Sequence, residues 1–499
     1  MAEKIKKLMN DSPAARWSAL ILIALMMFFG YMFVDVMAPI KSTLWGELGW
    51  DSGTYGTYRA AEYFLNVCGF LIIAGIILDK MGVRFTGLLS ASLMVVGGAI
   101  KFIGISEWFQ GTAFCAWLDQ VAILGLPGSA VLASLGFMIF GCGCEMAGTT
   151  VSKAIAKWFK GKEMAMAMGV EMAIARVGVF SVFSLSPIVH DAFLNSSLFG
   201  HNRGVVACVA FGLLLLVIGL LFFSVFCVMD KKFDKQLAEA NAAEGKEEGG
   251  DEFKLSDLKT IFSSLSFWVV ALLCVLYYSA IFPFQAYGAE MLQCNLDGIS
   301  AREASSIFRW FPIGAAIITP FLGSYLDRKG KGATMLIYGA LLLIVCHLVF
   351  AFVLPATDSK AIAYATIVVL GISFALVPAA LWPSVPKIIN EKVLGSAYCL
   401  IFWVQNIGLC FVPMIIGNVL ESVNASNPGV IAAKAEVEAA TAAHLDTDGI
   451  LIPYDYTVPL IIFACFGVAA LAIAIYLKAL DKKRDLGLEK PNIVPEAAE

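Results

Sequence analysis

Two charged side chains lie deep within apolar segments on either side of a short basic turn, residues 156–163 (AKWFKGKE). Trp158 lies 13 residues past Glu145, and Arg176 lies 13 residues past Glu163. At 1.5 Å per helical residue, both charges are expected roughly 20 Å from the turn, well inside the roughly 30 Å of membrane hydrocarbon. An ionised side chain there costs at least about 2.5 to 3.5 kcal/mol unless it faces a partner or water. An acid and a base at this shared depth therefore indicate either a binding site for a charged molecule or a buried ion pair that fixes two helices.

The composition is that of a membrane protein with many spanning helices. Of the 499 residues, 59% are hydrophobic and 15% are charged, and the mean hydropathy is +0.81; an ordinary soluble chain has roughly 25% charged residues. No signal peptide is expected, because the start is polar and basic and the first apolar run is long enough to remain as a span. We expect a lipid bilayer around the chain and no nucleic-acid partner.

Twelve apolar stretches are long enough to span a membrane, six before and six after a polar gap. They lie near residues 17–40, 54–78, 85–105, 130–153, 164–189, 204–228, 265–290, 305–326, 333–354, 361–384, 394–420 and 457–478. The gap is rich in Gly, Glu and Lys, which cannot build a core, and this predicts a solvated linker between two halves.

The predicted fold class is an all-α polytopic membrane protein of two pseudo-symmetric six-helix bundles. Lys and Arg gather in alternate short loops and in both tails, an excess that retains those segments in the cytoplasm. Both termini are therefore expected to be cytoplasmic. The predicted parts are a tail at 1–16, a bundle at 17–229, the linker at 230–258, a second bundle at 259–480 and a tail at 481–499.

A weak internal repeat supports the division into halves. GIILDKMGVR, residues 75–84, follows the second predicted span, and GSYLDRKGKG, residues 323–332, follows the second span of the latter half. Each string places an aspartate, a cation and a turn-making glycine at a cytoplasmic helix end. Two such strings in register resemble the loop motif of the major facilitator superfamily. The residues to which this resemblance assigns gating and structure are Asp79, Arg84, Asp327 and Arg328.

A longer stretch resembles the lysosomal dipeptide uniporters within that superfamily. Residues 141–178 carry Glu145, the WFKGKE turn and the AR-x-G string that ends at Gly178. Phe33 and Asp35 in the first span match that family's aromatic-then-Asp string. Further similar strings are YYSAIFPF at 277–284, ALWPSVP at 380–386, LGSAY at 394–398 and QNIG at 405–408.

This resemblance implies transport of short peptides, with Glu145 holding the ammonium of the peptide and Arg176 its carboxylate. The geometry agrees, because two extended residues span about 7 Å and packed helix axes lie about 8 to 10 Å apart. Arg suits a terminal carboxylate better than Lys would, since it offers a planar fork of donors. The remaining nominations are Tyr278, Phe282 and Trp382 as aromatic walls, and Gln405 and Asn406 as partners of the peptide amide.

Glu171 departs from the family pattern, in which an uncharged amide is expected. This extra acid lies within a turn and a half of Arg176, where it could bind a proton and couple transport to a proton gradient, or pair with Lys153. Asp35 is a second candidate for proton coupling. The sequence is therefore compatible with two mechanisms, facilitated transport and proton-coupled import.

Three classes of function follow from these residues. The first is a dipeptide transporter. The second is a transporter of organic anions, in which Arg176 binds a carboxylate and Glu145 serves the mechanism. The third is a receptor or scaffold, although no large signalling domain is evident. No enzyme site, cofactor or metal site is expected, because the 12 cysteines are mostly single residues in apolar runs and the 4 histidines are scattered.

Two further expectations concern the membrane faces and the host membrane. Glu290 and Arg309 lie near the outer ends of their spans, and we interpret them as snorkelling or gate residues rather than ligands. No acidic dileucine sorting signal precedes Trp17, which argues against lysosomal residence and against the family's accessory glycoprotein partner. We therefore predict an inner cell membrane, with the lysosomal membrane as the alternative.

Overall fold

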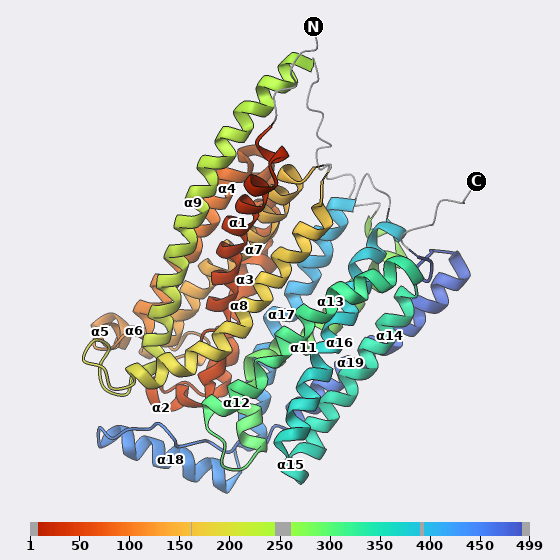
Figure 1. The fold of residues 1–499 in the computed structure, drawn as a ribbon. Coiled ribbons are helices and arrows are strands. Elements are labelled where there is room, and N and C mark those ends of the chain that lie inside the picture. The colour runs from red at the N-terminus through yellow and green to blue at the C-terminus, as the bar shows by residue number, and fades with distance from the viewer. Residues whose placement is uncertain (1–7, 161, 245–260, 390–393, 492–499) are drawn as a thin grey trace.

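The computed structural model describes residues 8–160, 162–244, 261–389 and 394–491, and in these ranges the chain is almost entirely helical (Figure 1). The elements of the first half are η1 (Met9–Asp11), α1 (Pro13–Val34), η2 (Ala38–Thr43), α2 (Leu44–Leu48), α3 (Ser52–Leu65), η3 (Asn66–Phe70), α4 (Leu71–Ile105), α5 (Glu107–Gln110), α6 (Ala113–Val121), η4 (Ile123–Gly125), α7 (Gly128–Trp158), α8 (Met164–Phe193) and α9 (Gly204–Glu244).

The second half repeats this plan of long helices joined by short connections. Its elements are α11 (Leu265–Asn295), α12 (Ala301–Phe308), α13 (Trp310–Lys329), α14 (Gly332–Leu348), η5 (Val349–Val353), α15 (Leu354–Thr357), α16 (Lys360–Ile388), α17 (Leu394–Asn424), α18 (Pro428–Ala442) and α19 (Thr457–Arg484).

The described residues contain eleven helical segments that are long and apolar enough to cross a membrane. One of them, Ser52–Ile105, has 54 residues, which at 1.5 Å per residue would reach about 80 Å, far more than one crossing needs. Gly82 interrupts it with non-helical angles, φ 75° and ψ 174°. This segment therefore contains the second and third predicted spans, so the described residues form an all-helical fold with twelve crossings, as predicted.

The two loop strings that predicted an internal repeat share a backbone conformation. Gly82 and Gly330 each follow the motif aspartate by three residues, and both have a positive φ, 75° and 71°. Such angles are strained for residues with a Cβ, so glycine is required at both turns. A Cβ at Gly330 would also lie 2.4 Å from the Glu489 carbonyl oxygen, because the segment after α19 packs onto this loop.

The two halves lie side by side and pack along helices that belong to different halves (Figure 1). Helix α3 packs along α17, and α8 packs along α13. The α3–α17 contact is close because glycines face backbone: a Cβ at Gly56 would lie 2.4 Å from the Pro413 carbonyl oxygen, and one at Gly417 would lie 2.2 Å from that of Ser52. Small residues that let backbones approach are a usual basis for helix association in membranes.

The first helix begins and the last helix ends at the same end of the bundle, which we call the basic end because α7 ends there with Lys157 in its last turn (Figure 1). Helix α18 lies across the opposite end, which we call the far end. The segment after α18 reaches from the second half onto the first: the Asn202 amide donates to the Thr447 hydroxyl at 2.7 Å, and the Asn195 amide to Asp446 at 3.1 Å.

The predicted linker begins as a helix rather than as an open segment. Helix α9 continues through Glu244, so the boundary predicted at residue 230 falls inside it, and residues 245–258 lie outside the described ranges. Asp230 is buried, and its carboxylate accepts hydrogen bonds from the Trp158 indole N–H and the Lys157 ammonium, both at 2.8 Å. This carboxylate therefore ties the basic turn to α9.

Candidate functional site

Glu145 lies on α7, one turn after a glycine that sets the position of this helix. A Cβ at Gly141 would lie 1.9 Å from the carbonyl oxygen of Glu62, so only glycine permits this approach of α7 to α3. The Glu145 side chain is partly exposed. Within the described residues no ion pair or hydrogen bond engages its carboxylate. An acid in the middle of a spanning helix is thus left free to meet a cation.

Arg176 lies on α8, two residues before another glycine at a helix contact. A Cβ at Gly178 would lie 2.6 Å from the Phe28 carbonyl oxygen on α1. The guanidinium carbon lies 4.4 Å from the ring centre of Phe374, on α16 of the other half. Its Nη1 atom is buried and has no hydrogen-bond partner in the described part of the chain. Stacking of this kind fixes the guanidinium plane and leaves the N–H groups at its edge for an anion.

The two charges do not pair with each other. No ion pair or hydrogen bond joins Glu145 and Arg176 among the residues that the structure describes. Tyr31 on α1, a residue that the sequence did not single out, is partly exposed and lies within electrostatic reach of both and of Glu171. Helices α7 and α8 both pack on α1. The acid and the base therefore flank one tyrosine, and the geometry does not match a locked ion pair.

The aromatic residues predicted as walls come together in the second half, opposite Arg176. Tyr278 stacks on Phe282 with ring centres 5.5 Å apart, and the Trp382 indole N–H donates to the Tyr278 hydroxyl at 3.2 Å. Phe374 joins them edge-on to Phe282 at 5.6 Å. Phe374 could not be recognised from the sequence, because nothing in residues 371–378 (GISFALVP) distinguishes it from a packing residue.

The two amide residues nominated for the peptide bond lie on α17, beside residues that neighbour the aromatic walls: Cys274 lies within electrostatic reach of Tyr278, and Phe402 stacks on Trp382 with ring centres 4.8 Å apart. Gln405 is buried and accepts a contact from the Cys274 thiol at 3.5 Å. Asn406 is buried and donates to the Phe402 carbonyl of its own helix at 3.0 Å, whereas its Oδ1 has no partner in the described residues. No hydrogen bond joins Asn406 to Tyr278 or Trp382 among the described residues.

Asp35 belongs to a buried charge cluster that the sequence did not reveal. Its carboxylate lies 3.3 Å from the Arg59 guanidinium, which also lies 3.7 Å from Glu62. The Gln285 amide, from the second half, donates to Asp35 at 2.5 Å. Lys101 lies beside the cluster with its ammonium 4.4 Å from the Phe33 ring centre. Asp35 thus links the two halves instead of standing free.

A metal ion has no evident set of ligands in the described ranges. No three His, Cys, Asp or Glu side chains converge there in a way that could hold a metal ion.

The sequence model of the Major Facilitator Superfamily matches residues 20–413, most of the chain. The chain belongs to the major facilitator superfamily. It is therefore a membrane transporter and not an enzyme, and the resemblance seen in its loop motifs is confirmed.

Relatives within the superfamily agree with the closer resemblance. The chain is 28% identical over 334 residues to "Lysosomal dipeptide transporter MFSD1" of Gallus gallus, which covers 64% of this chain and 71% of that one. It is 25% identical over 414 residues to the human protein of the same name, covering 82% and 81%. The fold is similar to that of a bacterial homologue of the human lysosomal transporter Spinster in an inward-facing and unoccupied conformation, with a TM-score of 0.65 at 14% identity, covering 97% of this chain and 100% of that one.

The superfamily loop motifs at the basic end have different partners in the two halves. Asp79 pairs with Lys153 at 2.6 Å, so Lys153 is not the partner of Glu171 that the sequence left open. Arg84 pairs with Asp234 and, at 3.2 Å, with Asp230 of α9.

The second-half motif packs against the segment that follows α19. Asp327 lies within electrostatic reach of Lys387, and Arg328 is exposed. Lys387 donates to the carbonyl oxygens of Gly487 and Lys490 at 3.0 and 2.9 Å.

Proposed function

We propose that this transporter moves short zwitterionic peptides, dipeptides in particular, between Glu145 and Arg176. The observation that carries the proposal is that both charges are partly exposed within the spanning region and neither has an ionic partner among the described residues. Unpaired charges in a membrane are costly, so their retention favours a substrate that supplies both missing partners. The ammonium of a peptide would meet Glu145, and its carboxylate would meet Arg176.

The surroundings of the pair suit such a ligand. Tyr31 lies within electrostatic reach of both charges, and its hydroxyl could bond to the peptide backbone. Phe374 holds the guanidinium from the opposite half, which leaves its donors for a carboxylate. The walls formed by Tyr278, Phe282 and Trp382 would accept varied side chains with little selectivity. We keep Gln405 and Asn406 as weaker candidates for the peptide amide, because Asn406 has one unpartnered oxygen.

The alternative substrate, an organic anion without an ammonium, fits less well. It would satisfy Arg176 and leave the Glu145 carboxylate without a cation. The names of the relatives, which are lysosomal dipeptide transporters, point the same way as the geometry.

The transport cycle we propose is alternating access, in which the halves rock about this site. The basic end would face the cytoplasm, in keeping with the excess of Lys and Arg there. Glu171 is partly exposed and has no ionic partner among the described residues, so a proton could bind it; we nevertheless take facilitated transport as the working mechanism. The host membrane stays a prediction between the cell membrane and the lysosome.

A thermal-shift screen of the purified protein tests the substrate class. Dipeptides should raise the melting temperature more than single amino acids or dicarboxylates at equal concentration, because only a ligand with both charges at peptide spacing meets both side chains. Glu145→Gln should remove most of the dipeptide response. Stabilisation by dicarboxylates that exceeds stabilisation by every dipeptide would establish the organic-anion alternative instead.

A further inference from the structure

A buried ion pair joins the two halves at the far end. The Lys41 ammonium, on η2 of the first half, contacts the Glu290 carboxylate, on α11 of the second half. Only 3% of the Lys41 side chain and 4% of the Glu290 side chain are exposed. Glu290 is therefore neither a snorkelling residue nor an exposed rim charge, and its carboxylate needs a cation.

Aromatic rings and hydroxyls complete the surroundings of the Lys41 ammonium. Its nitrogen lies 5.1 Å from the ring centre of Tyr287 and 5.6 Å from those of Tyr55 and Tyr454. It also donates to the Ser52 hydroxyl at 2.8 Å. One carboxylate, one hydroxyl and three ring faces around a primary ammonium are the groups that recognise such a cation in general.

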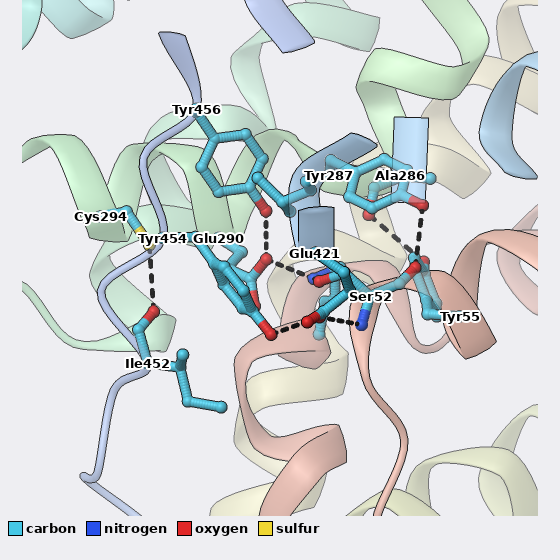
Figure 2. A network of polar contacts seen from close by, with 12 residues as sticks. Ser52, Tyr55, Ala286, Tyr287, Glu290, Cys294, Glu421, Ile452, Tyr454 and Tyr456 are labelled. Atoms are coloured by element: carbon cyan, nitrogen blue, oxygen red, sulfur yellow. Dashed lines mark hydrogen bonds and ion pairs between the residues drawn. The ribbon is translucent and has the colours of Figure 1, made fainter. Parts of the chain in front are cut away.

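The carboxylate is itself held in place from the second half. The Tyr456 hydroxyl donates to Glu290, and Figure 2 shows this hydroxyl pointing at the carboxylate. Burial and the Glu290 carboxylate raise the pKa of Tyr456 well above its ordinary value, so that the phenol stays protonated and donates. The Tyr454 hydroxyl donates to Glu421 at 2.5 Å, which fixes that ring beside the ammonium (Figure 2).

We call the residues around the Lys41–Glu290 contact the cage, and they divide unequally between the two halves. Glu290, Tyr287, Tyr454 and Tyr456 all belong to the second half, whereas the first half contributes Lys41 with Ser52 and Tyr55. Rocking of the halves that opens the far end would withdraw Lys41 and leave a carboxylate with three tyrosines facing the opening. A recess at the far end already borders the pair; residues of both halves line it, among them Lys41, Tyr55, Glu290 and Tyr454.

We propose that Glu290 and these three tyrosines are an outer subsite for a primary ammonium, which takes the place of Lys41 when the far end opens. The ammonium would be that of the incoming peptide, and this part of the inference rests on the proposed function. Closure would then return Lys41 to Glu290 and release the peptide toward Glu145. A role in closure alone, with no ligand, is the competing account.

Rescue by a small amine tests the subsite without any transported substrate. Lys41→Ala removes the occupant of the cage, and ethylammonium chloride is added to the purified full-length protein. We expect ethylammonium to raise the melting temperature of this variant relative to sodium chloride of equal ionic strength. The wild type, in which Lys41 occupies the cage, and Lys41→Ala/Glu290→Gln, which lacks the carboxylate, should show no such shift. An equal shift in all three proteins, or none in Lys41→Ala, would overturn the proposal.

Transport measured from each side of the membrane distinguishes a binding subsite from a latch, by which we mean a contact that only holds the far end closed. This measurement does not depend on whether Lys41→Ala folds. In Glu290→Gln, the half-saturating dipeptide concentration should rise about tenfold from the far side, the size expected when a charge-assisted hydrogen bond is lost, and change less than about twofold from the basic side. Glu303→Gln is the matched control, because Glu303 is an exposed carboxylate that pairs with Lys360. A changed maximal rate with an unchanged half-saturating concentration from the far side would make Glu290 a latch only.

The ethylammonium arm can fail or succeed independently of the proposed function, whereas the transport arm requires that dipeptides are substrates. Rescue by ethylammonium requires only the cage, so it survives if dipeptides prove not to be substrates. Loss of dipeptide transport in Glu145 or Arg176 variants, in turn, says nothing about Glu290.

Discussion

Around the candidate site, the two halves present different chemistry to the interface between them. The first half supplies charge: Glu145, Glu171 and Arg176 are partly exposed and lie within electrostatic reach of Tyr31. The second half supplies rings, with Phe374 stacked under the guanidinium and Trp382 bonded to the Tyr278 hydroxyl. For the proposed substrates, this difference would separate two tasks, because dipeptides share the same charged ends and differ in their side chains.

The charges on α7 and α8 differ from the other buried charges of the bundle. Each ionised group within the hydrocarbon depth costs free energy; Asp35 and Glu290 have cationic partners, whereas Glu145, Glu171 and Arg176 are partly exposed and have no ionic partner among the described residues. Rings, in contrast, are stable in an apolar region and can accept varied surfaces. Under the proposed function, the first half would determine whether a peptide binds, and the second half would determine which peptide binds better.

The largest effect is expected from Arg176→Ala. Removing the guanidinium leaves the peptide carboxylate without its partner, and losing one member of a buried charge pair costs about 2 to 5 kcal/mol, so dipeptide uptake should fall by at least about 30-fold. Uptake into proteoliposomes is the measurement. Arg302→Ala, an exposed far-end arginine, is the control and should transport normally; near-normal uptake in Arg176→Ala would contradict the assignment.

The next largest effect is expected from Glu145→Gln, which should also weaken the binding of dipeptides. The neutral amide keeps the shape of the side chain and gives up the charge, so affinity for a free amino terminus should fall by about tenfold or more. Competition assays with N-acetylated peptides provide the measurement. Discrimination against N-acetylation should largely disappear in the variant, and undiminished discrimination would show that another acid binds the ammonium.

A smaller effect is expected on the aromatic side. In Trp382→Ala, peptides with bulky side chains should bind up to about tenfold more weakly, because ring contacts contribute about 0.5 to 1.5 kcal/mol each. Glycyl-glycine, which has no side chain to contact a wall, should bind as before. If both peptides lose affinity equally, the wall is needed for the shape of the site and does not select side chains.

Glu171→Gln should have the smallest effect. Its carboxylate has no ionic partner in the described residues, so removal of its charge breaks no pair, and uptake without a gradient should change less than about twofold. A proton ionophore should leave the final accumulation of dipeptide unchanged in both proteins. Accumulation that the ionophore abolishes in the wild type and not in the variant would establish proton coupling through Glu171.

Much of the fold could be predicted from the sequence, because local patterns determine it. Apolar runs of spanning length predicted the crossings, and the aspartates of two loop strings predicted a repeat whose glycines, Gly82 and Gly330, share a positive φ. The sequence did not indicate that α9 continues through Glu244. Polar residues after a span are equally compatible with a solvated linker and with a helix that leaves the membrane.

The sequence pointed to candidate site residues where charge made them conspicuous or where a string resembled the family, as it did for Tyr278 and Trp382. Glu145 and Arg176 stood out because acids and bases are rare in apolar runs, but Phe374 and Tyr31 look like ordinary packing residues. The Lys41–Glu290 pair joins residues 249 positions apart, and the Asp35–Gln285 bond joins residues 250 apart. Such contacts depend on how the halves meet, which no local pattern contains.

Binding of four ligands to three proteins tests the central claim most directly. Alanyl-alanine, its N-acetyl form, its C-terminal amide and the doubly blocked peptide are titrated by calorimetry into the wild type, Glu145→Gln and Arg176→Ala. We predict that N-acetylation weakens binding to the wild type and Arg176→Ala but not to Glu145→Gln, and that amidation weakens binding to the wild type and Glu145→Gln but not to Arg176→Ala. Equal losses for each blocked peptide in all three proteins would contradict the claim that these two side chains hold the two ends of the substrate.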